Sequence, residues 1–301
     1  MMTRRELIKT GGAALVSWAV GAGTAGTARA GENTGKLKKA VQLGMIQEKL
    51  SLMDKFKLAK ELGFDGVELN SPDANDKDEL KKACEATGLG ISEVVDSLHW
   101  KETLSSPNPD VRARGVEALK TALEDAKRFG ASSVLLVPAV VNKNVNYADA
   151  YKRSQEEIRK VIPFAQEQGV KIAVENVWNQ FLLSPLEMAR YVDEFESPWV
   201  GVHFDVGNVV NYGWPEQWIR ILGKRILKLH IKEYSRARRD KEGLWKGFEV
   251  KLGDGDCDWP AVVKALGEIG YNGWATAEVP GGDRTVLQDI SARMDKCLGL
   301  N

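Results

Sequence analysis

The chain has 301 residues, 43% of them hydrophobic and 28% charged, so it is long enough to bury a full core and short enough to form one domain. Acidic and basic residues balance, and without residues 1–30 there remain 38 basic and 41 acidic side chains. A nearly neutral protein lacks the broad basic surface that binding to a nucleic-acid backbone requires, so we expect no DNA or RNA partner. Three widely spaced cysteines predict neither a disulfide framework nor a zinc knuckle.

An export signal is predicted at the N-terminus. A twin arginine, Arg4-Arg5, precedes a weakly apolar stretch that ends in Ala28-Arg29-Ala30, a small-x-small cleavage motif. The stretch is rich in Gly and Thr and shorter than the roughly 20 apolar residues of a stable membrane anchor. We therefore interpret residues 1–30 as a twin-arginine signal that directs the protein to the periplasm, and residues 31–40 as a polar linker. The alternative is a retained amphipathic tail.

From residue 41 onward, short apolar runs alternate with longer amphipathic segments, which is the pattern of repeated βα units. Eight runs predict strands, at residues 41–46, 66–70, 91–95, 133–137, 170–175, 200–205, 226–231 and 273–279. Helix patterns such as 112–129 lie between them, and several end at a glycine just before the next strand: Gly63, Gly88, Gly130, Gly169 and Gly270. Eight units predict an α/β fold, a single (β/α)8 TIM barrel over residues 41–301. Residues 233–257 are predicted to form an irregular loop over the barrel mouth.

Four side chains of metal-ligand type fall at the predicted C-terminal ends of four successive strands. They are Glu175, Asp205, His230 and Glu278. These strand ends meet at one mouth of a TIM barrel, where its chemistry takes place. Buried carboxylates are costly unless they are paired or bound to metal, so the group predicts one divalent ion; its oxygen-rich donors suit Mn or Mg, with Co or Zn compatible. The alternative is a buried ion-pair network that uses the inward-facing Lys171 and Lys228.

Other polar residues near the mouth are candidates for contact with a substrate. His99 follows the third predicted strand, and Glu68 faces the mouth from the second. Lys232 lies two residues beyond His230 on the same face, where an ammonium group would neutralise an enediolate or a phosphate. His203 shares strand parity with Asp205, and we expect it to be a packed interior residue rather than a ligand.

Several stretches resemble the sugar isomerase and epimerase TIM-barrel superfamily, which includes xylose isomerase-like proteins, and within it the L-ribulose-5-phosphate 3-epimerases. They are GFDGVELN, KIAVENVWNQFLLSP, SPWVGVHFDVGNVVNYG, LKLHIKE and the G-D-G-x-x-D-W pattern at residues 253–259. The resemblance runs from about residue 41 to the C-terminus. It implies that the four strand-end residues bind one divalent metal and that Glu175 and Glu278 also move a proton.

The resemblance adds two residues to the substrate site. Arg236 is similar to an arginine that contacts substrate oxygen near the metal in ketose 3-epimerases. Asn208 stands where the epimerases of unphosphorylated ketoses carry a histidine, and the D-V-G-N form resembles that of the pentulose-phosphate epimerases. An exported enzyme, however, would rarely meet a sugar phosphate, so the motif and the signal point to different substrates.

The function that follows is a metal-dependent isomerase of a small sugar or sugar phosphate, of the L-ribulose-5-phosphate/L-xylulose-5-phosphate 3-epimerase type. A metal chelated by O2 and O3 would stabilise the enediolate formed when the C3 proton leaves. One glutamate would remove this proton and the other return it to the opposite face. An aldose-ketose isomerase, a sugar dehydratase and a non-catalytic exported sugar-binding barrel are the alternatives, and each is compatible with a homo-oligomer.

Overall fold

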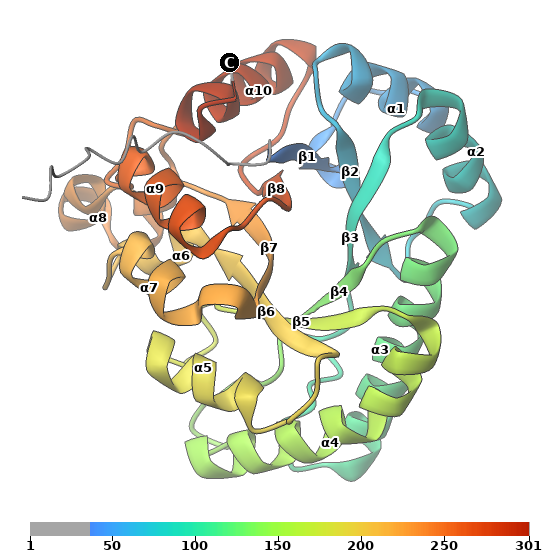
Figure 1. Ribbon diagram of the computed structural model, residues 1–301, viewed down its shortest axis with the longest axis vertical. Coiled ribbons are helices and arrows are strands. Elements are labelled where there is room, and N and C mark those ends of the chain that lie inside the picture. Colours follow the sequence, from blue (N-terminus) through green and yellow to red (C-terminus); the bar gives the residue numbers. More distant parts are fainter. Residues whose placement is uncertain (1–36, 301) are drawn as a thin grey trace, which may run out of the picture. The chain divides into compact units, whose positions relative to one another are not determined.

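The computed structural model describes residues 37–300, so the predicted export signal lies outside the described residues. Eight parallel strands form a closed barrel in chain order, in which β8 pairs with β1 (Figure 1). The strands are β1 (Lys38–Gln42), β2 (Gly66–Ser71), β3 (Gly90–Asp96), β4 (Ser133–Leu136), β5 (Lys171–Glu175), β6 (Val200–Asp205), β7 (Ile226–Ile231) and β8 (Trp274–Ala277). The predicted (β/α)8 barrel is therefore confirmed.

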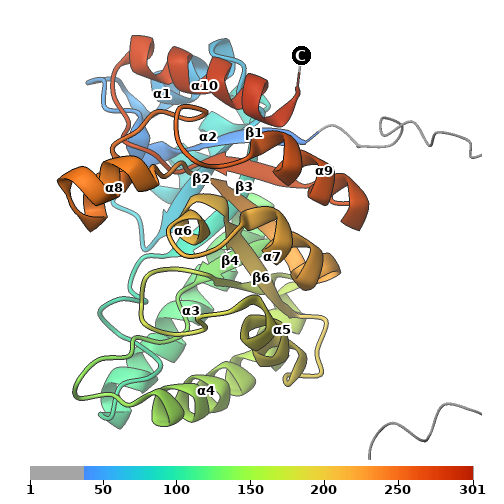
Figure 2. The same ribbon diagram turned by 90° about the vertical axis from the view of Figure 1, so that its left-hand side faces the viewer.

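Helices surround the barrel, as two views at right angles show (Figures 1 and 2). They are α1 (Leu52–Glu61), α2 (Lys77–Thr87), α3 (Pro109–Phe129), α4 (Tyr147–Gln168), α5 (Pro185–Asp193), α6 (Val206–Val210), α7 (Pro215–Leu222), α8 (Arg236–Glu242), α9 (Trp259–Ile269) and α10 (Arg284–Leu298). Short 3-10 turns are η1 (Leu43–Met45), η2 (Gly223–Arg225) and η3 (Leu244–Phe248). Within residues 37–300, no helix has both the length and the apolar character needed to cross a bilayer.

Helix α3 shows how local sequence sets the limits of an element. The Asn108 side chain accepts a hydrogen bond from the Asp110 backbone N–H, and Pro109 occupies the first turn, where its missing N–H costs nothing. The helix therefore begins three residues before the predicted 112–129 segment. It ends at Gly130, which has a φ of 77°, and the other four glycines predicted to end helices also have positive φ.

The first strand departs from the prediction. It covers Lys38–Gln42 instead of residues 41–46, and the chain then enters the turn η1. Residues 38–40 consequently belong to the barrel and not to a linker. The charged Lys39 interrupts the apolar pattern, so the sequence does not indicate a strand here. In the structure its side chain is buried, and its Nζ lies 2.6 Å from Asp295 Oδ1 and 2.9 Å from Ser291 Oγ.

The long connection after β7 is also more regular than predicted, because residues 233–257 contain α8 and η3. Ser235 caps α8 by accepting from the Arg238 backbone N–H. Glu233 joins the two ends of the connection, since its buried carboxylate accepts from the backbone N–H groups of Gly253 and Cys257 at 2.9 and 3.1 Å.

The barrel interior is polar near the site. Glu93 of β3 and His203 of β6 are buried and in contact, although β3 and β6 are separated by two strands in the sheet order, so their contact crosses the barrel. Glu93 also accepts from Ser133 Oγ of β4 at 2.6 Å. Buried polar groups are tolerated because they satisfy one another.

Candidate metal centre

Four strand ends bring the predicted ligand residues together. Glu175 and Asp205 are the last residues of β5 and β6, His230 is the last but one of β7, and Glu278 directly follows β8. One ligand atom from each lies within 4.8 Å of those of the others. The first three side chains are buried, and the side chain of Glu278 is 30% exposed.

The cluster contains buried atoms that lack a hydrogen bond of good geometry. Within residues 37–300, these include Asp205 Oδ2, His230 Nδ1 and Glu278 Oε2. His230 Nδ1 lies 3.5 Å from Glu175 Oε1 and 3.1 Å from Glu278 Oε2. Because leaving such groups unpaired costs about 1–3 kcal/mol each, their convergence fits a bound cation. One imidazole nitrogen and carboxylate oxygens are donors that Mn, Mg, Co and Zn accept.

Lys232 is the cationic partner of this cluster. Its Nζ lies 3.1 Å from Asp205 Oδ2 and 2.5 Å from Glu278 Oε2, so it partly neutralises both. Burial opposes its charge, but the carboxylates of Asp205, Glu278 and Glu175 hold the pKa of Lys232 above its usual value. The lysine that pairs with these carboxylates thus follows β7 directly, at a position different from the two expected for a buried ion-pair network.

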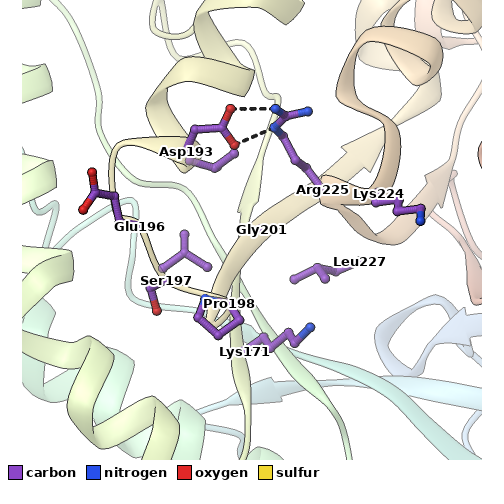
Figure 3. A pocket seen from close by; sticks show the side chains of 11 residues that line it. Lys171, Asp193, Glu196, Ser197, Pro198, Gly201, Lys224, Arg225 and Leu227 are labelled. Carbon is purple, nitrogen blue, oxygen red and sulfur yellow. Dashed lines mark hydrogen bonds and ion pairs between the residues drawn. The ribbon is translucent and has the colours of Figure 1, made fainter.

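The two lysines expected in that alternative contact none of the three carboxylates of the predicted ligand set. Lys228 Nζ donates to Ser132 Oγ at 2.9 Å. Lys171 is the first residue of β5 and lines a pocket at the opposite end of the barrel (Figure 3).

The concentration of charge and the burial of the cluster shift the pKa values of its members. Burial raises the pKa of Asp205 to about 7, and the charges of Glu278 and Glu175 act in the same direction against that of Lys232. Burial opposes protonation of His230, yet the charges of Glu68 and Glu278 raise its pKa well above the usual value. The chain therefore concentrates more negative charge here than Lys232 offsets, which favours a divalent cation.

Glu68, predicted to contact substrate, instead contacts His230. Its Oε1 and Oε2 lie 3.1 and 3.0 Å from His230 Nε2, and Gln42 Nε2 donates to Oε1 at 2.9 Å. A carboxylate on one imidazole nitrogen orients the ring and directs the other nitrogen, here Nδ1, toward the cluster. Sequence reasoning missed Gln42, whose signal is its register opposite Glu68 in the β1–β2 pair.

A pocket of about 250 Å³ opens beside the cluster. Its lining includes Glu175, His230 and Glu278 together with the predicted substrate residues His99 and Lys232. The full lining is Gln42, Val95, Ser97, His99, Trp100, Leu135, Glu175, Val177, His230, Lys232 and Glu278. It holds both polar groups and apolar walls, as small-molecule sites do.

His99 is held in one orientation in this pocket. Its Nδ1 accepts a hydrogen bond from the Val137 backbone N–H at 3.1 Å, so the ring proton resides on Nε2. Burial lowers the pKa of His99 to about 4, which keeps the ring neutral at physiological pH. No group of residues 37–300 accepts a hydrogen bond from Nε2, which leaves this N–H as a donor for a ligand.

Two other predicted substrate residues lie outside the pocket lining. Asn208 donates from Nδ2 to the Asn176 carbonyl at 3.0 Å, and its backbone N–H donates to Asp205 Oδ1 at 2.8 Å. Arg236 donates to the carbonyls of Val210 and Gly213 at 2.8 and 2.9 Å. Both side chains fasten the segment after β6, and the Asn208 backbone N–H steadies the carboxylate of Asp205.

A larger pocket of about 560 Å³ lies at the other end of the barrel (Figure 3). It adjoins the first residues of β5, β6 and β7, whereas the ligand residues are at the strand ends. Its Arg225 is engaged by Asp193 through two contacts of 2.7 and 2.6 Å. The N-terminal face of a TIM barrel serves stability, so the smaller pocket is the candidate site.

Comparisons with known proteins identify the family. Residues 56–297 match the family described as xylose isomerase-like TIM barrel. L-ribulose-5-phosphate 3-epimerase UlaE of Escherichia coli strain K12, and that of E. coli O1:K1 / APEC, are each 25% identical over 284 residues, covering 86% of this chain and 97% of the relative.

Solved structures share the fold. D-psicose 3-epimerase from Clostridium cellulolyticum H10 with D-tagatose has a TM-score of 0.72 and 21% identity, covering 88% of this chain and 99% of that one. The 3-keto-D-glucoside 4-epimerase YcjR from E. coli has a TM-score of 0.71 and 18% identity, covering 87% and 99%. With four-fifths of its length matched, the chain belongs to the xylose isomerase-like TIM-barrel family.

Proposed function

We propose that this protein is a carbohydrate epimerase that inverts C3 of a ketose or ketose phosphate with one divalent ion, Mn, Mg, Co or Zn. The observation that carries the proposal is the placement of Glu175 and Glu278. They come from β5 and from the end of β8, with β6 and β7 between them, and both approach His230 Nδ1. Curated relatives named as L-ribulose-5-phosphate 3-epimerases, and a fold neighbour named as a D-psicose 3-epimerase, support this reaction class.

The reaction requires two positioned bases and a charge opposite the substrate oxygens. Glu175 removes the proton on C3, and Glu278 delivers a proton to the other face of the same carbon; for the other epimer the roles exchange. When bound by Glu175, Asp205, His230 and Glu278, a divalent ion would supply the positive charge that stabilises negative charge developing on the substrate oxygens. Lys232, fixed beside Glu278, adds a second positive charge at the pocket wall.

Three neutral groups would orient the sugar. The Nε2–H of His99 donates to a substrate oxygen, while Trp100 and Val177 supply apolar walls for the carbon skeleton. Glu68 acts on His230 and not on the sugar, since its carboxylate is committed to the imidazole. Asn208 and Arg236 support the loop beside the ligands.

We further propose that the chain is exported by the twin-arginine route to the periplasm, on the strength of residues 1–30. Folding and metal loading before export would suit a site whose four ligands come from strands spread over about 100 residues. A small sugar is then the substrate, without a nucleic-acid partner or a stable membrane anchor.

The test is isotope exchange. The metal-loaded protein is incubated in deuterated water with a panel of free and phosphorylated ketoses, and label is sought at C3 and at C1. Label at C3 with formation of the epimer supports the proposal, whereas label at C1 with aldose formation identifies an aldose-ketose isomerase. Loss of water from the sugar identifies a dehydratase, and tight binding without exchange identifies a sugar-binding barrel.

A second measurement tests the ion. Asp205→Ala and His230→Ala each remove one ligand, and both should lose the metal while the barrel stays folded. Full metal occupancy in both variants would remove these residues from the site.

A further inference from the structure

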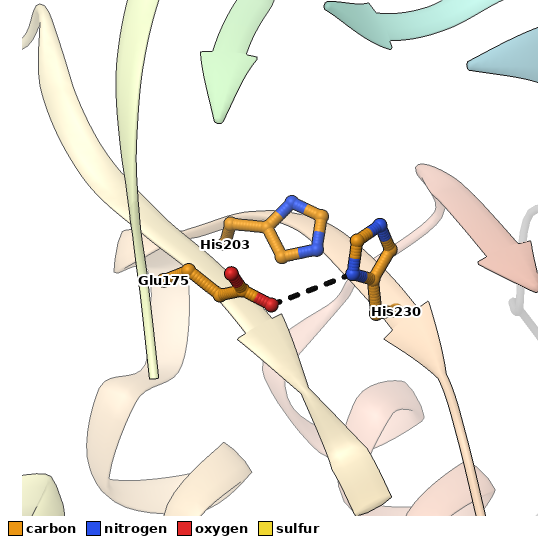
Figure 4. Close-up of side chains that lie close together, drawn as sticks. All are labelled: Glu175, His203 and His230. Carbon is orange, nitrogen blue, oxygen red and sulfur yellow. Dashed lines mark ion pairs between the residues drawn. The ribbon is translucent and has the colours of Figure 1, made fainter. Parts of the chain in front are cut away.

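Two buried imidazoles at the base of the site have the same arrangement. His230 Nε2 lies 3.0 Å from Glu68 Oε2, and His203 Nδ1 lies 2.5 Å from Glu93 Oε2. The two rings pack with centroids 4.0 Å apart. In each pair, a carboxylate fixes one ring nitrogen. The other nitrogen of His230 faces Glu175, and the His203 ring packs beside that of His230 (Figure 4).

These other nitrogens make no hydrogen bond to the part of the chain that the structure describes, although His230 Nδ1 lies at ion-pair distance from Glu175 and Glu278. Both His203 Nε2 and His230 Nδ1 are buried without a hydrogen bond within residues 37–300. Glu175, His203 and His230 each offer one ligand atom, and these three atoms lie within 4.8 Å of one another. A carboxylate on the far nitrogen of an imidazole is the usual support of a metal-binding histidine, because it fixes the ring and increases its basicity.

We propose that the chain has two alternative positions for its one ion. The outer position uses Glu175, Asp205, His230 and Glu278, and the inner position uses Glu175, His203 and His230. This inference deepens the proposed function, because it concerns the ion of the same site.

Occupancy of the two positions is mutually exclusive. They share His230, whose Nε2 is held by Glu68, so Nδ1 is the one nitrogen it offers. A nitrogen lone pair binds one ion at a time. The site therefore holds one ion per chain, and the ion selects between the two sets of ligands.

The chemistry of the ion determines which position it takes. The outer set offers three carboxylates and one imidazole, whereas the inner set offers one carboxylate and two imidazoles. Carboxylate ligands suit Mg²⁺ and Mn²⁺, and imidazole ligands suit Zn²⁺, Co²⁺ and Ni²⁺. Zn²⁺ should therefore occupy the inner position and Mn²⁺ the outer one, where the ion lies closer to the two proposed bases.

The experiment counts imidazoles around each ion in the wild-type protein. Metal is removed from the full chain with a chelator, and the protein is reloaded with Zn²⁺ or Mn²⁺ and studied by X-ray absorption spectroscopy. We expect two imidazole nitrogens around Zn²⁺ and one around Mn²⁺. One imidazole around Zn²⁺ would overturn the inner position and leave His203 a packed interior residue.

A variant pair checks the identity of the second imidazole. His203→Gln combined with Glu93→Gln replaces the buried pair by two neutral amides, so no buried charge is left alone. Zn²⁺ in this variant should show one imidazole, and its affinity relative to Mn²⁺ should fall at least ~10-fold, as expected for a lost ligand. His99→Asn removes a histidine outside both sets and should leave two imidazoles around Zn²⁺.

These outcomes are independent of catalysis. Two imidazoles around Zn²⁺ without label exchange into any ketose would support the inner position and contradict the proposed function. One imidazole with rapid exchange at C3 would do the reverse.

Discussion

Lys232 Nζ and Glu278 Oε2 lie 2.5 Å apart, so the ammonium group neutralises an oxygen that a metal ion would also use. The Lys232 ammonium group and a bound cation would therefore repel each other, because both would lie beside the same carboxylates. Lys232→Met should increase affinity for Mn²⁺ by ~10-fold or more, since about 1.4 kcal/mol of relieved repulsion corresponds to tenfold. Calorimetric titration of the stripped protein measures this, with the exposed Lys224→Met as a control of equal charge change. Unchanged or weaker binding in Lys232→Met would show that the lysine does not compete with the ion.

The two glutamates should differ in their effect on the two epimers. Glu175→Gln and Glu278→Gln each keep one ligand oxygen but remove a base, so turnover should fall by ~10² to 10⁴. Each variant should slow solvent exchange from one epimer more than from the other, because each base faces one side of C3. Exchange is followed by deuterium incorporation into each purified epimer. Equal residual exchange from both epimers in both variants would indicate transfer by a single base on one face, as in an aldose-ketose isomerase.

Two substitutions separate the two nitrogens of His99. Asn retains an acceptor near the position of Nδ1 and can keep the bond from the Val137 N–H, but it offers no donor in place of Nε2. Gln places an amide donor near Nε2 and loses the acceptor. His99→Asn should therefore fold as the wild type does with kcat/KM reduced by ~10- to 150-fold, as for the loss of one hydrogen bond of about 1.5–3 kcal/mol. His99→Gln should be less stable and more active than His99→Asn; the reverse order would assign His99 a structural role.

His99 also predicts a dependence of stability on pH. Its pKa is about 4 in the folded protein and about 6.5 when exposed. Between these values the unfolded chain binds the proton and the folded chain does not, so this histidine destabilises the fold as the pH falls from about 6.5 to 4. His99→Asn removes this contribution. Thermal unfolding across this range should show a smaller loss of stability in the variant, and parallel curves would contradict the low pKa.

Gly255 is required by its contact with Glu233. A Cβ at this position would lie 2.6 Å from Glu233 Oε1 and 2.7 Å from the Tyr234 carbonyl oxygen. Gly255→Ala should cost about 1–3 kcal/mol of stability, because the backbone or the Glu233 carboxylate must move. Gly44→Ala is the control, since nothing lies within 4 Å of its Cβ. Denaturant titration of both variants tests this; equal stabilities would show that the segment adjusts freely.

The export proposal depends on the twin arginine. Replacing Arg4 and Arg5 by Lys keeps the charge but removes the recognised pair, so an intact precursor should accumulate inside the cell. Cell fractionation followed by mass measurement of the chain distinguishes the precursor from the trimmed form. Normal export and trimming of the lysine variant would contradict our interpretation of residues 1–30.

The strands that carry the site residues were predictable because each is an apolar run with clear ends in the sequence. Runs 200–205 and 226–231 match β6 and β7 residue for residue, since each is an apolar run with a ligand residue at or near its end. Once the strand ends are known, the parallel barrel brings Glu175, Asp205 and His230 to one mouth. The convergence of these side chains thus follows from the pattern and the fold together.

Contacts across the barrel were not predictable in this way. Glu93 and His203 are 110 residues apart in the sequence. The alternation of side chains along each strand predicts that both point into the barrel, but it does not predict that they lie at the same height and meet. Parity likewise directs Glu68 toward the mouth but does not show that His230 is its partner. Asn208 and Arg236 bind backbone carbonyls of loops, at Asn176 and Gly213, and a periodic pattern does not describe the course of a loop.

Glu233 has a consequence for how this protein can diversify. Its carboxylate accepts hydrogen bonds from Gly253 and Cys257 beside the end of β7. Both ends of the segment 233–257 are therefore held in place, independently of the residues between them. Apart from Arg236 and Phe248, which contact the chain after β6 and Lys232, the residues of α8 and η3 can then change without displacing His230. The segment is therefore a place where the chain tolerates insertion and substitution while the strand that carries His230 stays in position.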